Sequence, residues 1–286
     1  MTSAVSEYHL GEITVRGRSL GGFYTGLHVP QYHALFDVGT ALRTGASAKN
    51  IFISHAHADH LGALPALLGM RGLIGHRVPI RLFCPAHLEE YIRDLLRTFS
   101  EMHHWPLEVD MNPMVDGDVL PVAKNLFVQA FRTLHTVPSL GYMLVRRIQK
   151  LRTEFLSLDG REIARLKAEG ADLFRIEERP EFAYATDTLP EVLDRHPRLL
   201  QVKNLVLECT FLDEKKTVKN ARAGCHIHLD QLLPYLDRMN NHQVLLMHFS
   251  QLYQPSEVRE IFDRRCPAAH RSRFQLLLPD GEGWWD

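Results

Sequence analysis

The chain has 286 residues, 45% hydrophobic and 23% charged, so it is long enough to bury a substantial core within one domain of packed layers. Its formal net charge of −1 excludes a generally basic surface, and a nucleic acid would have to meet a local basic patch. No apolar run is long enough to span a bilayer, so no membrane segment is expected. Four scattered cysteines without a CxxC pair and the lack of a visible secretory signal predict a reduced, cytoplasmic protein.

Short strands are expected in the first forty residues. The ranges 12–16, 23–29 and 32–36 have the composition of strands, and the glycine-rich stretch 17–22 is expected to be a tight hairpin turn rather than a phosphate loop. Asp37 follows the last of these strands. It could orient a metal-bound imidazole, or it could only cap Thr40, and the sequence leaves both possibilities open.

The stretch 51–60 combines a strand with four metal-competent side chains. Its first four residues predict a buried strand, and alternation carries His55 and His57 to the same face. Asp59 and His60 fall where the chain turns into an apolar helix expected over 61–73. Imidazole nitrogens with a carboxylate suit zinc, and less often manganese or iron. The stretch therefore predicts a metal site rather than a solvated loop.

The next elements contribute one further candidate ligand. A strand is expected over 80–83 and a helix over 86–102, and His87, His103 and His104 are interpreted as surface or core histidines. A strand over 126–131 leads to His135. A single histidine at a strand end is usually structural, but a two-metal site still needs ligands, so His135 is assigned to the metal set.

The segment 146–179 is charged and mixed in sign, with a helix expected over 160–169. It opens with the basic residues Arg146, Arg147, Lys150 and Arg152. These side chains could contact phosphates, or they could form an ordinary solvated face.

Three later strands each end in one acidic or histidine residue. Asp187 follows 182–186, Glu208 ends 204–208, and His248 follows 243–247. Side chains at such ends are held by the sheet and still reach the surface, as catalytic groups require. His226 and His228 precede a helix expected over 229–239, and both could be helix caps.

Together the strand ends supply seven candidate ligands, which is too many for one tetrahedral zinc and suits two ions. His55, His57 and His135 are assigned to one ion and Asp59, His60 and His248 to the other, with Asp187 bridging because a carboxylate has two oxygens. Two cations sharing a water suit hydrolysis of a phosphodiester. Asp59 could help to deprotonate that water, and His226, oriented by Glu208, is the candidate general acid.

The motif at 55–60, with His135, Asp187 and His248, resembles the metallo-β-lactamase superfamily, and nearly the whole chain is similar to its ribonuclease Z family. The stretches 134–142, 185–188, 208–213 and 224–228 carry the resemblance, which is greatest for the short, plant-type branch. The resemblance implies an αββα sandwich of the α/β class, two zinc ions, and cleavage of precursor tRNA that leaves a 3′-hydroxyl and a 5′-phosphate. It favours the catalytic role for His226.

The same resemblance implies a homodimer in which the arm of one subunit grips the tRNA that the other subunit cuts. By position the arm is a short insertion at about 146–179 in a single domain over 1–286, which favours phosphate binding by its basic residues. The chain lacks the Pro/Lys/Arg/Asn loop of many bacterial members and has Leu252 where many members have arginine. A hydrolase of a small phosphodiester or thioester is the alternative function. A binding protein without activity would not need the complete ligand set.

Overall fold

Two seven-stranded sheets pack face to face in this computed structural model, which describes residues 5–76, 78–281 and 283–285. The first sheet has the order β1-β2-β3-β4-β5-β6-β7 and the second β14-β13-β12-β11-β10-β9-β8. The strands are β1 (Ser6–Leu10), β2 (Ile13–Leu20), β3 (Tyr24–Val29), β4 (Ala34–Phe36), β5 (Asn50–Phe52), β6 (Ile80–Pro85), β7 (Val109–Met114), β8 (Val119–Ala123), β9 (Leu126–Arg132), β10 (Leu140–Leu151), β11 (Phe174–Ala185), β12 (Asn204–Glu208), β13 (Gln243–Met247) and β14 (Phe274–Leu276).

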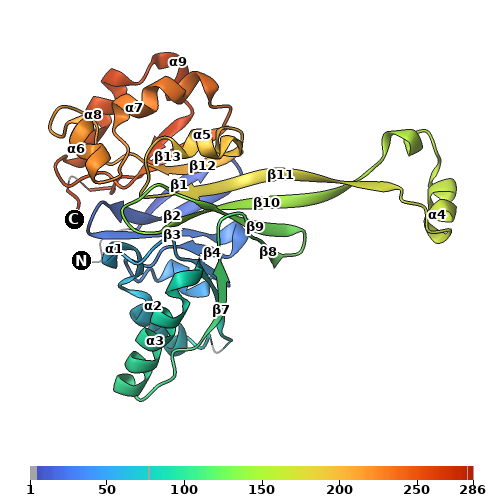
Figure 1. The fold of residues 1–286 in the computed structure, drawn as a ribbon, viewed down its shortest axis with the longest axis horizontal. Helices are drawn as coiled ribbons and strands as arrows, with labels where there is room; N and C mark the ends of the chain where they lie inside the picture. Colours follow the sequence, from blue (N-terminus) through green and yellow to red (C-terminus); the bar gives the residue numbers. More distant parts are fainter. Residues whose placement is uncertain (1–4, 77, 282, 286) are drawn as a thin grey trace.

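Helices cover the outer face of each sheet (Figure 1). The α-helices of the described residues are α1 (Ala58–Leu61), α2 (Leu64–Leu73), α3 (Glu89–His103), α4 (Gly160–Ala168), which lies away from both sheets, α5 (Val192–Arg195), α6 (Val218–Ala223), α7 (Leu229–Leu232), α8 (Pro255–Arg265) and α9 (Ala268–Arg271). One apolar cluster lies between the sheets, a second packs the first sheet on α2 and α3, and a third packs the second sheet on α5 to α8. The predicted α/β fold, an αββα sandwich, is confirmed. Among the described residues, none of the helices combines the length and apolar content needed to cross a bilayer.

Parallel pairing decides which strand ends meet. β4 to β7 are parallel in the first sheet and β11 to β14 in the second, so their carboxyl ends collect at one edge of the sandwich. Asp37, Asp187 and His248 follow β4, β11 and β13 at this edge, and all three have positive φ angles of 55°, 43° and 63°. This conformation is uncommon outside glycine and concentrates at functional sites, where the surrounding structure maintains it.

The predicted glycine-rich turn over 17–22 is wrong in its bounds. β2 continues through Leu20 and only 21–23 form the turn to β3. Gly17 is an interior strand residue, where an added Cβ would lie 2.2 Å from the carbonyl oxygen of Gly26 on β3. The glycine there permits close approach of two strands rather than a change of direction.

Three predicted helices are interrupted or begin later than expected. The expected helix over 61–73 begins only at Leu64, as α2, because Leu61 ends α1. The expected helix over 86–102 opens with one 3₁₀ turn before α3. The expected helix over 229–239 is α7 followed by a 3₁₀ helix (Leu233–Arg238), in which Pro234 provides no amide donor. The expected strand over 32–36 is shortened to β4, because 30–32 form a 3₁₀ turn.

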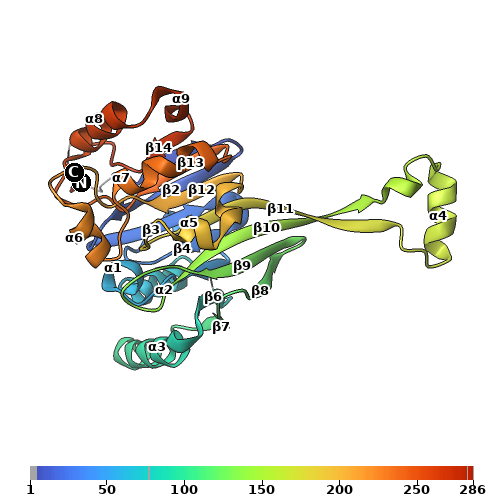
Figure 2. The same ribbon diagram turned by 45° about the horizontal axis from the view of Figure 1, so that its top comes forward.

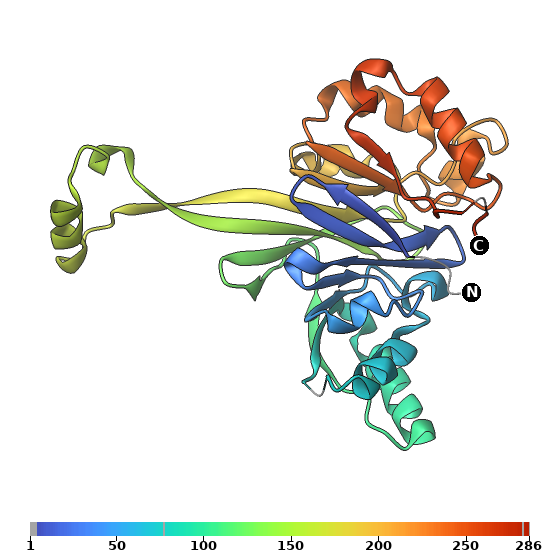
Figure 3. The same cartoon turned by 180° about the vertical axis from the view of Figure 1, so that it is seen from behind.

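The segment 146–179 forms an arm that projects from the sandwich (Figures 1 and 2). β10 and β11 pair from Tyr142 and Tyr184 out to Leu151 and Phe174, beyond the reach of their neighbours β9 and β12. α4 lies at the far end, as the predicted helix over 160–169, and begins with a capping box of Asp159 and Glu162. From behind, the arm again extends clear of both helix layers (Figure 3).

Candidate metal centre

The candidate ligands gather at the shared edge in two groups. His55, His57, His135 and Asp187 form one group, and Asp59, His60 and His248 form the other, with the ligand atoms of each group within 4.8 Å of one another. These are the two sets that the sequence assigns to two ions. Residues separated by almost two hundred positions therefore come together because the strands that carry them end at one edge.

Asp187 lies between the two groups and presents one oxygen to each. Its Oδ2 lies 3.7 Å from His55 Nε2 and 3.6 Å from His135 Nε2. Its Oδ1 lies 3.3 Å from the Nε2 atoms of His60 and His248. This division of the two oxygens is what a bridging carboxylate requires.

Imidazole nitrogens in both groups point at one another, and one of them is left without a hydrogen-bond partner. His60 Nε2 lies 3.3 Å from His248 Nε2, and His135 Nε2 lies 3.2 Å from His57 Nδ1. The buried Nε2 of His55 has no hydrogen-bond partner. Burying an unpaired nitrogen is costly, and a bound cation removes that cost by accepting the lone pairs. The residues present therefore fit a metal centre.

The protonation states of His55 and Asp59 agree with metal binding. At His60 burial lowers the pKa, but the carboxylates of Asp187 and Asp37 outweigh it and raise the pKa above its ordinary value, so a bound cation would have to displace a proton there. Burial is the main cause that lowers the pKa of His55 to about 2, which keeps its imidazole neutral. Burial alone would raise the pKa of Asp59, but contacts with His248 and His60 bring it well below its usual range. A neutral imidazole and an ionised carboxylate are the forms that bind a metal.

Asp37 contacts the candidate ligand His60 on the side of its ring away from the metal position. It is fully buried, and its Oδ2 lies 2.7 Å from His60 Nδ1. The same oxygen accepts hydrogen bonds from Tyr184 Oη at 2.6 Å and Ser54 Oγ at 2.8 Å. Of the two roles that the sequence left open, the structure shows the one that orients an imidazole and leaves its Nε2 for the metal position.

His226 lies beside the clusters, in the loop between α6 and α7. Its ring centroid is 5.4 Å from those of His135 and His248, and its Nδ1 lies 3.1 Å from Glu208 Oε1. Burial lowers the pKa of His226, but the Glu208 carboxylate outweighs it and the result is a pKa of about 9. His226 also lies within ligand distance of Asp187 and His248.

Glu208 and His228 are held by different partners. Glu208 is fully buried and accepts hydrogen bonds from the Thr188 amide at 2.6 Å and Thr210 Oγ1 at 2.5 Å. His228 caps α7, since its Nδ1 accepts from the Asp230 amide at 3.1 Å. His226 thus belongs to the site, whereas His228 caps a helix and bonds the carbonyl of Asp213 through its Nε2 at 3.0 Å.

Four contributors to the site escaped the sequence prediction. Ser54 and Tyr184 bind Asp37, Thr210 lies 3.1 Å from His248 Nδ1, and the Gly22 amide donates to Asp59 Oδ2 at 2.9 Å. Ser54 precedes the candidate ligand His55, and Thr210 lies two residues after Glu208, so their positions were a usable hint. Tyr184 and Gly22 gave none, because a tyrosine in a strand and a glycine in a turn are ordinary.

The predicted RNA contacts do not approach the metal cluster. Arg146, Arg147 and Lys150 line the arm and pair with carboxylates of β11 at 2.6, 3.1 and 2.8 Å, and Arg152 pairs with Asp172. The three other histidines interpreted as unrelated to the site, His87, His103 and His104, are exposed on or beside α3.

Comparison with known proteins places these observations in a family. Residues 25–249 match the model of the beta-lactamase superfamily domain. The chain is 33% identical over 253 residues to tRNase Z TRZ2, chloroplastic, of Arabidopsis thaliana, covering 88% of this chain and 71% of that protein. It is 32% identical over 264 residues to tRNase Z TRZ1 of the same plant, covering 92% and 94%. The metallo-beta-lactamase fold protein YhfI of Bacillus subtilis superposes with a TM-score of 0.62 at 13% identity, covering 92% of this chain and 95% of that one.

Proposed function

The chain belongs to the short, plant-type ribonuclease Z family within the metallo-β-lactamase superfamily, and from that premise we propose that it is an endoribonuclease that hydrolyses a phosphodiester at the 3′ end of precursor tRNA. The observation that carries the proposal is Asp187, whose two oxygens face two separate groups of ligand atoms. The tRNA substrate is inferred from relatives named tRNase Z.

Two zinc ions suit this donor set best, with manganese or iron as the alternatives. His55, His57 and His135 would hold one ion, Asp59, His60 and His248 the other, and Asp187 both. When bound, such a pair lowers the pKa of a shared water and neutralises charge that develops on the phosphoryl oxygens.

The remaining steps belong to side chains of this chain. Asp59 accepts a hydrogen bond from the attacking water and helps to remove its proton. His226 donates a proton to the departing 3′ oxygen, which leaves the tRNA with a 3′-hydroxyl. Because Glu208 occupies Nδ1 of His226, the other ring nitrogen is the one available to the substrate, and a pKa of about 9 keeps it protonated at neutral pH. The contact with Glu208 favours proton donation by His226 over binding of a metal ion by its imidazole.

The arm supplies the RNA-binding part of the proposal. In a homodimer, the arm of one subunit would grip the tRNA that the other subunit cuts. The carboxylates that pair with Arg146, Arg147, Lys150 and Arg152 are partly exposed, and exposed pairs are weak enough to be exchanged for phosphates.

Two further parts of the proposal concern assembly and compartment. The exposed apolar side chains of Leu73, Met102 and Trp105 offer a surface that a second copy of the chain could cover. The four free cysteines fit a reducing compartment such as the cytoplasm, although one relative is named chloroplastic.

One assay tests the function against its alternatives. Zinc-loaded protein is incubated in parallel with a precursor tRNA, a cyclic nucleotide and a thioester. We expect cleavage of the precursor tRNA to a product with a 3′-hydroxyl, and no cleavage by the Asp59→Ala variant, which still binds tRNA. Turnover of only the cyclic nucleotide or the thioester would establish a small-molecule hydrolase, and turnover of none of them would leave a binding protein.

A further inference from the structure

The turn between β2 and β3, residues 21–23, touches the metal cluster directly. The Gly22 amide donates to Asp59 Oδ2 at 2.9 Å, and the Gly21 amide donates to the carbonyl of Phe249 at 3.0 Å. A Cβ on Gly21 would lie 3.3 Å from the imidazole of His248, so the turn and that ring are in close contact. The position of this turn therefore decides where Asp59 and His248 can lie.

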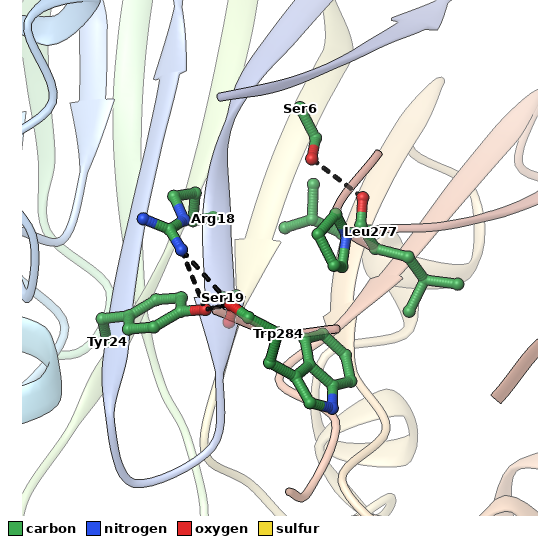
Figure 4. Close-up of a pocket in the computed structure, with 8 residues that line it drawn as sticks. Ser6, Arg18, Ser19, Tyr24, Leu277 and Trp284 are labelled. Atoms are coloured by element: carbon green, nitrogen blue, oxygen red, sulfur yellow. Dashed lines mark hydrogen bonds between the residues drawn. The ribbon is translucent and has the colours of Figure 1, made fainter. Parts of the chain in front are cut away.

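Trp284 and Trp285, in a segment from the other end of the chain, contact the β2–β3 hairpin. Trp284 is buried, and its indole Nε1 donates to the carbonyl of Tyr253 at 2.6 Å. Its own carbonyl accepts from Tyr24 Oη at 2.9 Å and Arg18 Nη2 at 3.3 Å, both on the strands that flank the turn (Figure 4). These bonds anchor the segment to α8 through the preceding loop on one side and to the β2–β3 hairpin on the other.

Trp285 packs on the turn itself. Its ring lies edge-to-face against Phe23 at 5.2 Å between centroids and against Tyr24 at 5.8 Å. Such pairs favour one geometry beyond the area they bury. Phe23 is the last residue of the turn and follows Gly22, whose amide donates to Asp59, so the aromatic contact restrains the turn one residue after the donor.

The atom that receives the Gly22 hydrogen bond also faces the metal position. Asp59 Oδ2 lies 3.4 Å from His60 Nε2 and 3.6 Å from His248 Nε2. A rotation of this carboxylate would remove its oxygen from the second ligand group. A partner that fixes the orientation of a ligand typically changes metal affinity or activity by 10–100-fold when it is lost.

We propose that Trp284 and Trp285 are positioning residues: they clamp the β2–β3 turn so that the Gly22 amide holds Asp59 in the orientation that binds the second metal ion. This inference rests on the metal centre of the proposed function. It assigns a role to two aromatic side chains that otherwise only close one edge of the sandwich.

Zinc affinity tests this proposal without RNA. Trp285→Ala should lower the protein's affinity for the more weakly bound of the two zinc ions by about 10-fold. Competition with a chromophoric chelator measures this affinity. Trp285→Phe, which keeps an aromatic ring against Phe23, should restore most of that affinity. The control is Tyr91→Ala, since Tyr91 is also an exposed aromatic side chain, 74% against 62%, but lies on α3, which carries no candidate ligand. Its zinc affinity should equal that of the wild type.

A double-mutant cycle tests the route of the effect. If the clamp acts through Asp59, Trp285→Ala should change zinc affinity by less than about twofold in an Asp59→Ala background. An equal loss in both backgrounds, or no loss in the Trp285→Ala protein, would overturn the proposal.

Kinetics separate positioning from a direct contact with RNA. With bis(p-nitrophenyl) phosphate and with precursor tRNA, the Trp285→Ala variant should lose kcat at saturating substrate while KM stays within about twofold. A rise in KM for the tRNA alone, with unchanged zinc affinity, would identify Trp285 as an RNA contact and refute the clamp. If wild-type protein leaves precursor tRNA uncut, the proposed function fails, and the zinc measurements still decide the role of the clamp.

Discussion

The metal cluster and the arm are both rich in charged residues, but they use charge in opposite ways. At the cluster, Asp37 and His60 are fully buried and joined at 2.7 Å, with further donors around them. On the arm, Arg147 and Glu178 are joined at 3.1 Å while about a third of each side chain stays exposed. The first network is rigid and surrounded by protein, whereas the second is open to water.

The difference shows what each region can do. Buried polar networks hold one geometry because every alternative leaves a group unpaired in a medium of low dielectric constant. Exposed ion pairs contribute at most about 1 kcal/mol each, so their partners can be exchanged. The cluster is thus suited to hold ions in fixed positions, and the arm to bind a flexible polyanion. The effects of substitutions in the two regions should therefore differ in magnitude and in the property that they change.

The largest effect is expected from the residue that joins the two ligand groups. Asp187→Asn keeps the size of the side chain but replaces one oxygen by an amide nitrogen, which cannot serve as a ligand. Because loss of a supporting partner alone costs 10–100-fold, loss of this bridging ligand should lower kcat/KM by more than about 100-fold. Elemental analysis should show less than the full zinc content. Wild-type activity in this variant would show that the cluster does not depend on a shared carboxylate.

A smaller effect is expected at Asp37, which contacts the candidate ligand His60 but is not a ligand itself. Asp37→Asn should lower zinc affinity or kcat by about 10-fold to 100-fold, because the negative charge that orients His60 is lost. The matched control is Asp110→Asn on β7, where the carboxylate is exposed and lies 3.9 Å from Arg81. Equal effects of the two substitutions would remove the distinction between buried and exposed carboxylates.

Burial of the His28 imidazole without a partner should make the stability of the sandwich sensitive to acid. Burial, with smaller contributions from Arg16 and His33, lowers the pKa of His28 to about 4, below its ordinary value of 6.5. The unfolded chain therefore binds more protons below pH 6.5, so this stabilisation is complete above that pH and is lost as the pH falls through 4. Wild-type protein should lose about 2 kcal/mol by pH 5 from this group.

Denaturant unfolding across pH 7 to pH 4.5 measures that loss. His28→Gln should make the pH dependence shallower than in the wild type, whereas His87→Gln, at an exposed position on the same sheet's helical side, should leave it unchanged. Identical curves for all three proteins would contradict the assignment to His28.

The smallest effect on the fold should come from the arm. Replacing Arg146, Arg147, Lys150 and Arg152 by alanine should change the free energy of unfolding by less than about 1 kcal/mol per ion pair. Binding to precursor tRNA should weaken, and its salt dependence should flatten by about 0.7 to 0.9 for each lost phosphate contact. Hydrolysis of bis(p-nitrophenyl) phosphate should stay the same. An unchanged salt slope would exclude these four residues from the RNA interface.

Several features of the site were predictable because they are local. A short strand followed within five residues by His55 and His57, with Asp59 and His60 at a helix start, favours metal binding whatever the fold. Strands β12 and β13 were predicted with their observed bounds, since a polar residue, a run of three or four apolar residues and then Glu208 or His248 leave little choice. The helix over 61–73 was predicted to begin three residues too early, since α2 begins at Leu64 with Pro65 in its first turn.

The amino-acid sequence by itself determined the candidate ligands, because residue type and strand pattern act over a few residues, and its family resemblance determined the αββα fold and the position of the arm. Only the tertiary structure decided that Asp187 offers one oxygen to each group, that Asp37 holds His60, and that the Gly22 amide reaches Asp59 under Trp285. Those contacts join residues that lie far apart in the chain. They depend on parallel strands that end at one edge and on backbone angles that no local pattern specifies.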